Sequence, residues 1–288
     1  MLNFRKISLA DKQTFETLSA ENPLDSCERI FPVNFAYSAN YGTEVADWNG
    51  GIAILKPNHG LLHYPLGKDA SPDELVEYAG EARAANIGLN CIFDVPAYYR
   101  QKFPGVDRYF DVVINADDFD YIYNLGELYE LKGPVLRKKR NHIKHFETQN
   151  PRWSSGEIDE SNIKEARDFA LSHAVDFEKT ALLCAFDNFA AAGFSGIVLR
   201  DEESKIVGLA VFAKISPQMY DVIFEKSDKQ TKGAAQMLVR LEARALLDRG
   251  AVFMNREEDL GLPNLRKAKK SLAPARMYER LSFIPKPL

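Results

Sequence analysis

The sequence predicts two α+β domains in tandem, each a mixed sheet flanked by helices. The chain has 288 residues, which is long for one compact core and comfortable for two. Hydrophobic residues make up 45% of the chain and charged residues 27%, an ordinary globular composition with enough apolar material for two cores. The second half also alternates helical and extended segments in the manner of a complete α+β domain.

Composition limits the partners and the compartment. The formal net charge is −4, so we expect no DNA binding, and any RNA contact must use a local basic patch. Cys27, Cys91 and Cys184 lie far apart, which argues against disulfides and a cysteine zinc site, so we expect no metal. No apolar stretch approaches the ~20 residues that span a bilayer. We therefore expect a cytoplasmic protein without integral membrane association.

The first half contains several short elements. Two extended runs at residues 51–55 and 60–64 are separated by turn residues, which predicts a hairpin. Ser71 and Pro72 are typical of a helix cap and a first helical position, so a helix begins there. Further strands are expected at residues 91–93 and 112–114.

A basic segment predicts the last helix of the first domain. Leu136, Ile143 and Phe146 share one helical face, and Pro151 ends the helix. We place the domain boundary near residues 147–158, with domains at 1–150 and 151–288. Cleavage near this boundary is expected to yield two pieces of similar secondary-structure content.

The second half follows an order known from one fold family. The expected elements are helices at 161–173 and 180–192, strands at 196–200, 206–213 and 219–226, a helix at 233–249, a strand at 251–254 and a helix from Pro263. Two helices, three strands, a long helix and another strand is the order of the acyl-CoA N-acyltransferase (GNAT) fold. This order predicts a GNAT-like fold for the second half.

The loop before the long helix is the sharpest local motif. It consists of Gln230, Thr231, Lys232, Gly233, Ala234 and Ala235. GNAT enzymes carry a similar Gln-x-x-Gly-x-Ala pattern, and the free N–H groups of a helix start favour a pyrophosphate. This interpretation makes acyl-CoA a candidate donor substrate. The alternative is that Gly233 and the alanines only permit close helix packing.

Two charged segments supply further candidate residues. In the basic run, the candidate phosphate-binding residues are Lys138, Lys139, Arg140 and Lys144, with a solvated helix face as the alternative. The candidate catalytic residues are Glu225, Asn255, Glu257 and Asp259. Residues two apart on a strand share a face, so the last three are expected to point together into a cleft beside Glu225 and to raise one another's pKa. The alternative is that these acids neutralise the basic helix that follows.

Three blocks of residues resemble a known family. They are residues 120–146, residues 224–233 and, most specifically, residues 255–271 with the run Asn-Arg-Glu-Glu-Asp-Leu-Gly. The set is similar to uncharacterised proteins grouped with the C-terminal domain of bacterial phosphatidylglycerol lysyltransferases. The resemblance implies two GNAT-like domains in one chain, as in Fem-type aminoacyltransferases, which move an aminoacyl group from charged tRNA to an amine or hydroxyl. The chain departs from many relatives at Leu272, where a tyrosine is expected.

These observations lead to two functional hypotheses. The first is a transferase that moves an acyl or aminoacyl group to a small-molecule amine or hydroxyl acceptor. The loop at residues 230–235 favours acyl-CoA as its donor, whereas the resemblance and the basic run favour aminoacyl-tRNA. The second is a non-catalytic ligand-binding protein on a degenerate GNAT fold.

Overall fold

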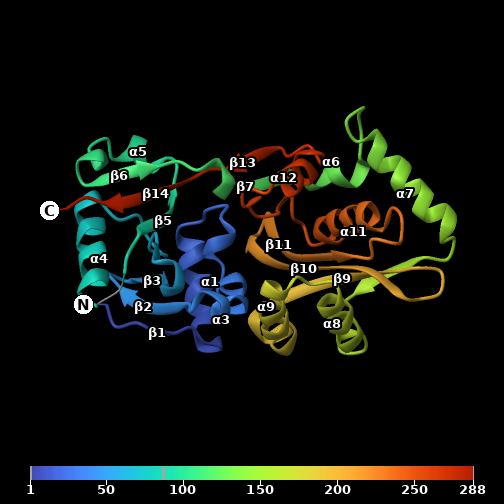
Figure 1. Ribbon diagram of the computed structural model, residues 1–288, viewed down its shortest axis with the longest axis horizontal. Coiled ribbons are helices and arrows are strands. Elements are labelled where there is room, and N and C mark those ends of the chain that lie inside the picture. Colours follow the sequence, from blue (N-terminus) through green and yellow to red (C-terminus); the bar gives the residue numbers. More distant parts are fainter. Residues whose placement is uncertain (1, 86–87, 288) are drawn as a thin grey trace. The chain divides into compact units, whose positions relative to one another are not determined.

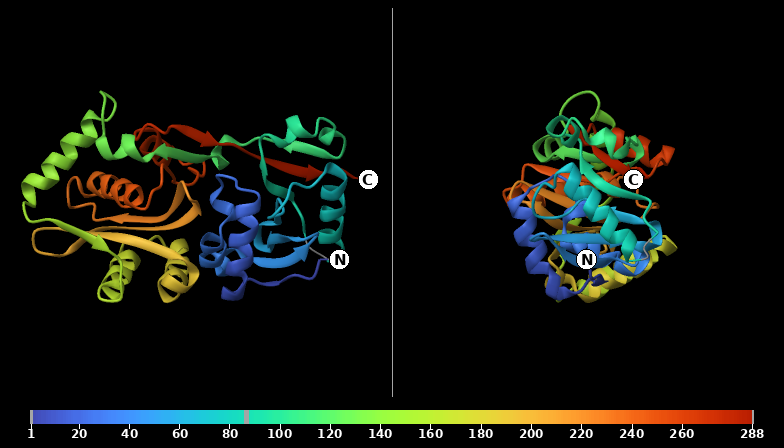
Figure 2. Two further views of the ribbon diagram at one scale, coloured as in Figure 1. Left: turned by 180° about the vertical axis from the view of Figure 1, so that it is seen from behind. Right: turned by 90° about the vertical axis from the view of Figure 1, so that its left-hand side faces the viewer.

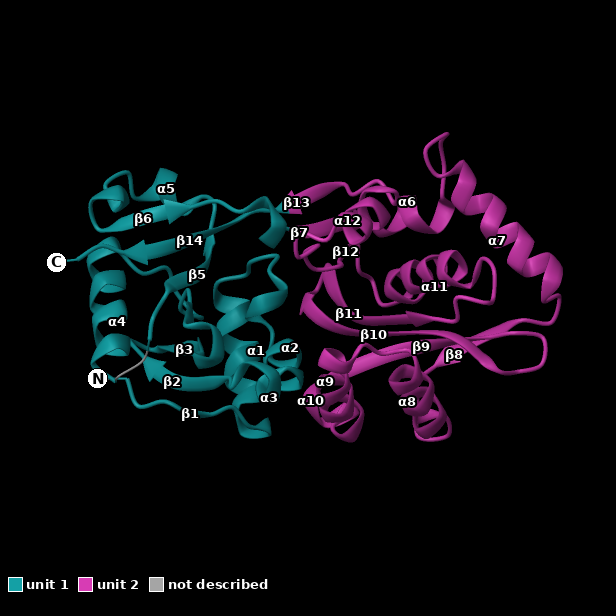
Figure 3. Cartoon of the chain, in the orientation of Figure 1, with its two compact units in different colours: residues 1–119, 278–288 teal, residues 120–277 magenta. Residues whose placement is uncertain are grey.

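The computed structural model describes residues 2–85 and 88–287, which form two compact units (Figure 3). Unit 1 consists of two segments, the chain up to Phe119 and the chain from Tyr278 onward. Unit 2 consists of Asp120–Met277. The boundary predicted near residues 147–158 is therefore wrong. The division falls some thirty residues earlier, and the C-terminal segment returns to unit 1.

Unit 1 contains a seven-stranded sheet in the order β1-β2-β3-β4-β5-β14-β6. Its strands are β1 (Arg5–Lys6), β2 (Glu44–Trp48), β3 (Gly51–Lys56), β4 (Leu61–His63), β5 (Cys91–Pro96), β6 (Phe110–Val113) and β14 (Arg280–Pro285). β4 and β5 run parallel, and the other neighbours are antiparallel. The predicted hairpin is confirmed as β3 and β4.

The helices of unit 1 begin where local signals place them. They are α1 (Lys12–Glu21), α2 (Phe31–Ala36), α3 (Ser38–Tyr41), α4 (Pro72–Ala84) and α5 (Tyr99–Lys102). The start of α4 is a capping box, because the Glu74 amide donates to Ser71 Oγ at 3.2 Å and the Ser71 amide donates to the Glu74 carboxylate at 2.8 Å. Leu75, Tyr78 and Ala79 of α4 are buried in the core of this unit.

Unit 2 contains a second seven-stranded sheet in the order β13-β7-β12-β11-β10-β9-β8. Its strands are β7 (Asp120–Asn124), β8 (Ser154–Glu157), β9 (Phe194–Arg200), β10 (Ile206–Ser216), β11 (Met219–Ser227), β12 (Phe253–Asn255) and β13 (Arg276–Tyr278). β11 and β12 run parallel, whereas β12 pairs with β7 in antiparallel fashion.

Helices cover both faces of this second sheet. They are α6 (Leu125–Glu130), α7 (Arg137–Gln149), α8 (Ile163–Ser172), α9 (Asp176–Asp187), α10 (Phe189–Ala192), α11 (Ala234–Asp248) and α12 (Pro263–Lys270). α11 lies on one face, and α8 and α9 lie on the other (Figures 1 and 2). The order predicted for the second half is confirmed except at residues 180–192, where the structure has the two helices α9 and α10 instead of one. The helix predicted in the basic segment is confirmed as α7, and Leu136, Ile143 and Phe146 are buried.

The two sheets follow the same order and exchange one strand. In unit 1, β14 lies between β5 and β6, and in unit 2 β7 takes the corresponding place between β12 and β13. β7 follows β6 along the chain, and β14 follows β13. β6 and β13 are edge strands, so each sheet is completed by the strand that follows an edge strand of the other unit along the chain.

This exchange predicts how fragments of the chain behave. A fragment of residues 120–279 keeps all strands of its sheet and is expected to unfold in one cooperative thermal transition. A fragment of residues 151–288 lacks β7, which exposes the edge of β12 and the apolar surface that Tyr121, Ile122 and Tyr123 bury. It is expected to show no such transition by circular dichroism. A cooperative transition in residues 151–288 would contradict the requirement for β7.

Candidate functional site

The site is built where β11 and β12 separate. The two strands pair in parallel as far as Asp221 and Asn255. β11 then continues to Ser227, while β12 ends at Asn255. The expectation that strand alternation aligns Asn255, Glu257 and Asp259 is wrong, because the extended backbone stops at Asn255. Glu257 has φ of 56° and begins a different local structure.

Several hydrogen bonds hold the turn that follows Asn255. The Asn255 side chain accepts from the Glu257 amide at 2.6 Å and donates to the Asp120 carboxylate at 2.8 Å. The Lys269 ammonium donates to the carbonyl oxygens of Arg256 and, at 3.1 Å, of Glu257. A left-handed backbone at a residue other than glycine persists only when its surroundings fix it, and such residues cluster at functional sites.

Glu257 is the acid that this turn leaves chemically available. Its side chain is half-buried, and it accepts no hydrogen bond and forms no ion pair within residues 2–85 and 88–287. Burial, together with the neighbouring carboxylates Asp221 and Glu258, raises the pKa of Glu257 well above its usual range. A carboxyl group with a raised pKa can exchange a proton near neutral pH.

Glu225 lies in a different group of charges, on β11. The Arg256 guanidinium donates to the carboxylates of both Glu225 and Glu242, the latter at 2.9 Å. Glu242 comes from α11 and is fully buried, and burial beside Glu225 raises its pKa well above its usual range. One cation between two carboxyl groups favours a state in which Glu242 keeps its proton.

Asp259 is engaged with the basic helix. The Arg266 side chain donates two hydrogen bonds of 2.8 Å to the Asp259 carboxylate, and the Tyr121 hydroxyl donates a third of 2.6 Å. These partners lower the pKa of Asp259 far below its usual range, the hydrogen bond from Arg266 contributing most. This geometry fits the alternative interpretation of the acidic run, in which Asp259 anchors α12 rather than taking part in chemistry.

The loop before α11 is closed by protein groups. The Asp228 side chain accepts from the Gln230 amide at 2.9 Å and from the Thr231 hydroxyl at 2.7 Å. Gly233 is buried, and a Cβ atom there would lie 2.2 Å from the carbonyl oxygen of His142 on α7. The packing favours the second interpretation of this loop, close approach of two helices, because a carboxylate occupies it and α7 covers its glycine.

The basic run on α7 divides into three environments. Lys138 and Lys144 are exposed. Arg140 caps the end of α6, donating to the carbonyl oxygens of Leu131 and, at 2.9 Å, of Gly133. Lys139 is half-buried and donates to Ser271 at 2.8 Å. Two of the four candidate phosphate-binding side chains are therefore exposed to solvent.

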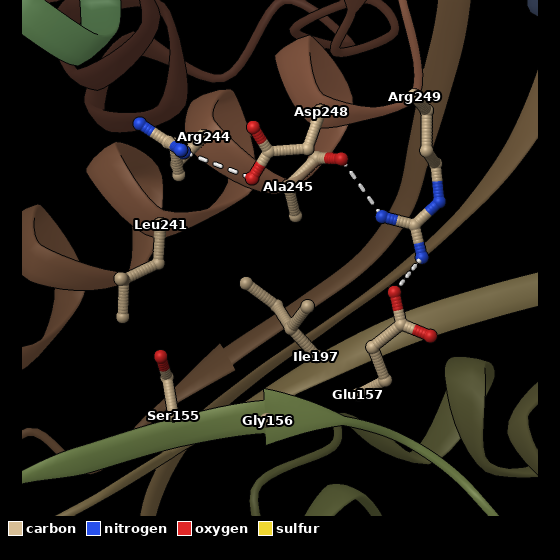
Figure 4. Close-up of a pocket in the computed structure, with 9 residues that line it drawn as sticks. All are labelled: Ser155, Gly156, Glu157, Ile197, Leu241, Arg244, Ala245, Asp248 and Arg249. Carbon is tan, nitrogen blue, oxygen red and sulfur yellow. Dashed lines mark hydrogen bonds and ion pairs between the residues drawn. The ribbon is translucent and has the colours of Figure 1, made fainter.

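A groove on unit 2 lies apart from these residues. It runs between β8 and the C-terminal half of α11, over an apolar floor of Ile197, Leu241 and Ala245 (Figure 4). The Arg249 guanidinium bridges across it, donating to the Ala245 carbonyl oxygen at 2.8 Å and to Glu157 at 2.6 Å. None of the residues singled out in the sequence lines this groove.

Unit 1 holds a buried charge cluster that the sequence did not reveal. Lys56 forms an ion pair with Glu28, and His63 Nδ1 lies 3.9 Å from the same carboxylate. Burial and the Lys56 charge lower the pKa of His63 to about 3, so the ring is neutral at physiological pH. Burial opposes ionisation of Glu28, but Lys56 and the other cations prevail and lower its pKa to about 2. The cluster is charge-compensated and ties the turn at Cys27–Arg29 to β3 and β4.

Sequence reasoning missed several residues of the site in unit 2. The burial of Glu242 could have been predicted from the sequence, because it lies four residues from both Leu238 and Leu246 on the apolar face of α11. A lone acid on such a face requires a cationic partner. Lys269 and Tyr121 lie in two of the blocks that resemble the known family, but no local pattern predicted their roles, since they contact the turn only through tertiary structure.

The fold is that of two tandem GNAT-like units, each a mixed sheet flanked by helices. An acetyltransferase of the GNAT family from Colwellia psychrerythraea matches 99% of this chain and 100% of its own, with 11% identity and a TM-score of 0.53. L-PGS from Bacillus licheniformis matches 96% of this chain and 93% of its own, with 13% identity and a TM-score of 0.69. A conserved protein of unknown function from Bacteroides thetaiotaomicron matches 99% and 100%, with 26% identity and a TM-score of 0.88.

The sequence family agrees with this fold. The family model of the C-terminal part of phosphatidylglycerol lysyltransferase matches residues 59–281. The chain therefore belongs to the phosphatidylglycerol lysyltransferase C-terminal family, and the resemblance seen in the sequence is confirmed. The search of curated proteins found no match. Within the described residues, no helix has the length and apolar character to cross a membrane.

Gly233 provides a test of the helix packing. Gly233→Ala combines a left-handed φ of 90° with the collision against His142, so we expect a loss of about 2–6 kcal/mol of unfolding free energy. Gly133→Ala is the matched control, because Gly133 has φ of 86° and nothing within 4 Å of its Cβ position. Its loss should be about 1 kcal/mol, from backbone strain alone. Equal losses in urea unfolding would contradict the packing described for Gly233.

Glu242 predicts a pH dependence of stability. A carboxyl group whose pKa is raised by folding stabilises the native state at low pH, and this contribution is lost as pH rises through the folded pKa. Glu242→Gln keeps the shape of the protonated form, so its unfolding free energy should exceed that of the wild type by an amount that grows with pH. The exposed Glu160→Gln is the control. A difference that does not change with pH would show that Glu242 is ionised in the native state.

Proposed function

We propose that this protein transfers an aminoacyl group from an activated ester to an amine or hydroxyl of a small acceptor, with Glu257 as the proton acceptor. The observation that supports it is the Glu257 carboxyl group, which has a raised pKa and no hydrogen-bonded partner in the described part of the chain. It lies at the end of a central strand, where α/β and related folds place reactive groups.

The proposed step needs little covalent chemistry from the protein. The acceptor nitrogen or oxygen attacks the donor carbonyl and Glu257 takes the proton of that acceptor. The bond from the carbonyl carbon to the leaving oxygen then breaks, Glu257 returns the proton to this oxygen, and the donor leaves as an alcohol. The turn residues position Glu257, because Asn255 and Lys269 both hold its backbone. Asn255 and Lys269 therefore orient the Glu257 carboxyl group. Asp259 supports the same turn indirectly, because it binds Arg266 of α12, the helix that also carries Lys269.

Aminoacyl-tRNA is the donor that the geometry favours. The loop at residues 230–235 has its glycine covered by α7 and its amides partly occupied by Asp228, which disfavours a CoA pyrophosphate there. α7 and α12 instead expose lysines suited to a phosphate backbone, namely Lys138, Lys144, Lys267 and Lys270. Charged tRNA as donor places the reaction in the cytoplasm. Acyl-CoA remains the less favoured donor.

The test compares Glu257→Gln with the exposed control Glu160→Gln. Transfer of a labelled amino acid from a mixture of charged tRNAs is measured against a panel of small amines and against phosphatidylglycerol vesicles. We expect Glu257→Gln to lower the rate by about 10²–10⁴-fold while its thermal midpoint and tRNA binding are unchanged. The wild-type rate should rise with pH through the raised pKa of Glu257, and the variant should lack this rise.

Three outcomes would overturn the proposal. A wild-type rate in Glu257→Gln would remove Glu257 from the reaction. Tighter binding of acetyl-CoA than of charged tRNA would contradict charged tRNA as the donor and favour acyl-CoA. No transfer from either donor to any acceptor would favour the alternative hypothesis of a non-catalytic binding protein.

A further inference from the structure

Lys139 differs from the other basic residues of α7. Its neighbours Arg137 and Lys138 are exposed, and so is Lys144 one turn further along, whereas Lys139 is half-buried and directed toward the end of α12. A buried lysine normally forms an ion pair with a carboxylate, because burying an unpaired ammonium group costs free energy. Lys139 is therefore in an unusual environment for a residue of a basic helix.

The partner of Lys139 is a hydroxyl group instead of a carboxylate. Its Nζ lies 2.8 Å from Ser271 Oγ, and no ion pair to it occurs in the parts of the chain that the structure describes. The acid whose charge favours the ammonium form of Lys139 is Glu225, and its carboxylate is already bound by Arg256. The ammonium form of Lys139 thus gains little from its surroundings.

Burial and the charge of Arg256 together lower the pKa of Lys139, and the attraction of Glu225 only partly opposes them. A larger share of its amine is therefore free at neutral pH than for a lysine in water. A free amine is the form that attacks carbonyl carbon, and lysines of this kind serve as nucleophiles in enzymes. The charge of Arg256, the residue that precedes Glu257 in the candidate site, also acts on Lys139.

We propose that Lys139 is a site of self-acylation, where the protein receives the acyl group of an activated ester on its own side chain. This inference rests on the proposed function for its natural donor. The Lys139 nitrogen forms a bond to the donor carbonyl carbon, the bond from that carbon to the leaving oxygen or sulfur breaks, and the alcohol or thiol departs with a proton. The product is an amide, which titrates no further.

Self-acylation changes the charge beside the candidate site. The amide carries no positive charge, so Arg256 loses a cationic neighbour and Ser271 loses its ammonium donor. The link between α7 and the end of α12 is weakened at the same time. Because α12 supplies Lys269 to the turn that holds Glu257, this modification acts on the residues that position the proposed proton acceptor.

The first experiment measures the reactivity of the amine without any enzymatic step. The intact protein is labelled with limiting sulfosuccinimidyl acetate, and the rate at each lysine is followed by tandem mass spectrometry. At neutral pH Lys139 should be acetylated faster than Lys138 and Lys144, and the difference should shrink at high pH, where all three amines are free. Slower labelling of Lys139 than of Lys138 at neutral pH would overturn the proposal.

The second experiment supplies an acyl thioester, S-acetyl-N-acetylcysteamine, to the intact protein. We expect one acetyl group on Lys139, its loss in Lys139→Arg, and its retention in the matched control Lys138→Arg. Glu257→Gln should keep the adduct, because Lys139 does not need that base, so failure of the proposed function and failure of self-acylation are distinguishable. An adduct spread evenly over the surface lysines, or no adduct on Lys139, would overturn the proposal.

Discussion

The antiparallel pairing of β7 with β12 determines where the charged groups of unit 2 lie. Ile122 pairs with Asn255, and the ladder continues beyond the end of β12, since the Tyr121 amide and carbonyl bond to Glu257 and Arg256 at 3.1 and 3.0 Å. The chain after Asn255 is therefore held against β7 while it leaves the direction of β11. That divergence orients Arg256 toward β11 and α11 and gives Glu257 its left-handed backbone.

Burial raises the pKa of the acids of this region and lowers the pKa of its bases, and the charged partners of each group determine the net shift. Asp259 has a guanidinium partner and stays ionised, and Arg256 has two carboxyl partners and stays charged. Glu257 and Lys139 lack partners of this strength, so burial raises the pKa of the acid and lowers that of the amine. Both shifts move a group toward the neutral range, where proton transfer and nucleophilic attack occur. The groups available for chemistry are thus Glu257 and Lys139, which lack a strong ion-pair partner among the described residues.

The elements that the sequence predicted correctly are those with local causes. Ser71 and Pro72 define the start of α4 through bonds within one turn, and the apolar stripe of α11 follows from its period alone. The acidic run after β12 was found for the same reason, because it follows an apolar strand directly. Its internal geometry was not predicted correctly, since alternation holds only while the backbone is extended and the turn at Glu257 depends on Asn255, Lys269 and Tyr121.

The sequence by itself determined the tandem α+β class, the order of elements in the second half and the presence of acids at the end of β12. Tertiary structure decided the membership of β7 and β14, the closure of the loop at Gly233 and the separate environments of Glu225 and Glu257. The physical reason is the range of the interactions. Capping and periodicity act within a few residues, whereas the bond between Tyr121 and Asp259 joins positions 138 residues apart, and no local pattern encodes such a pairing.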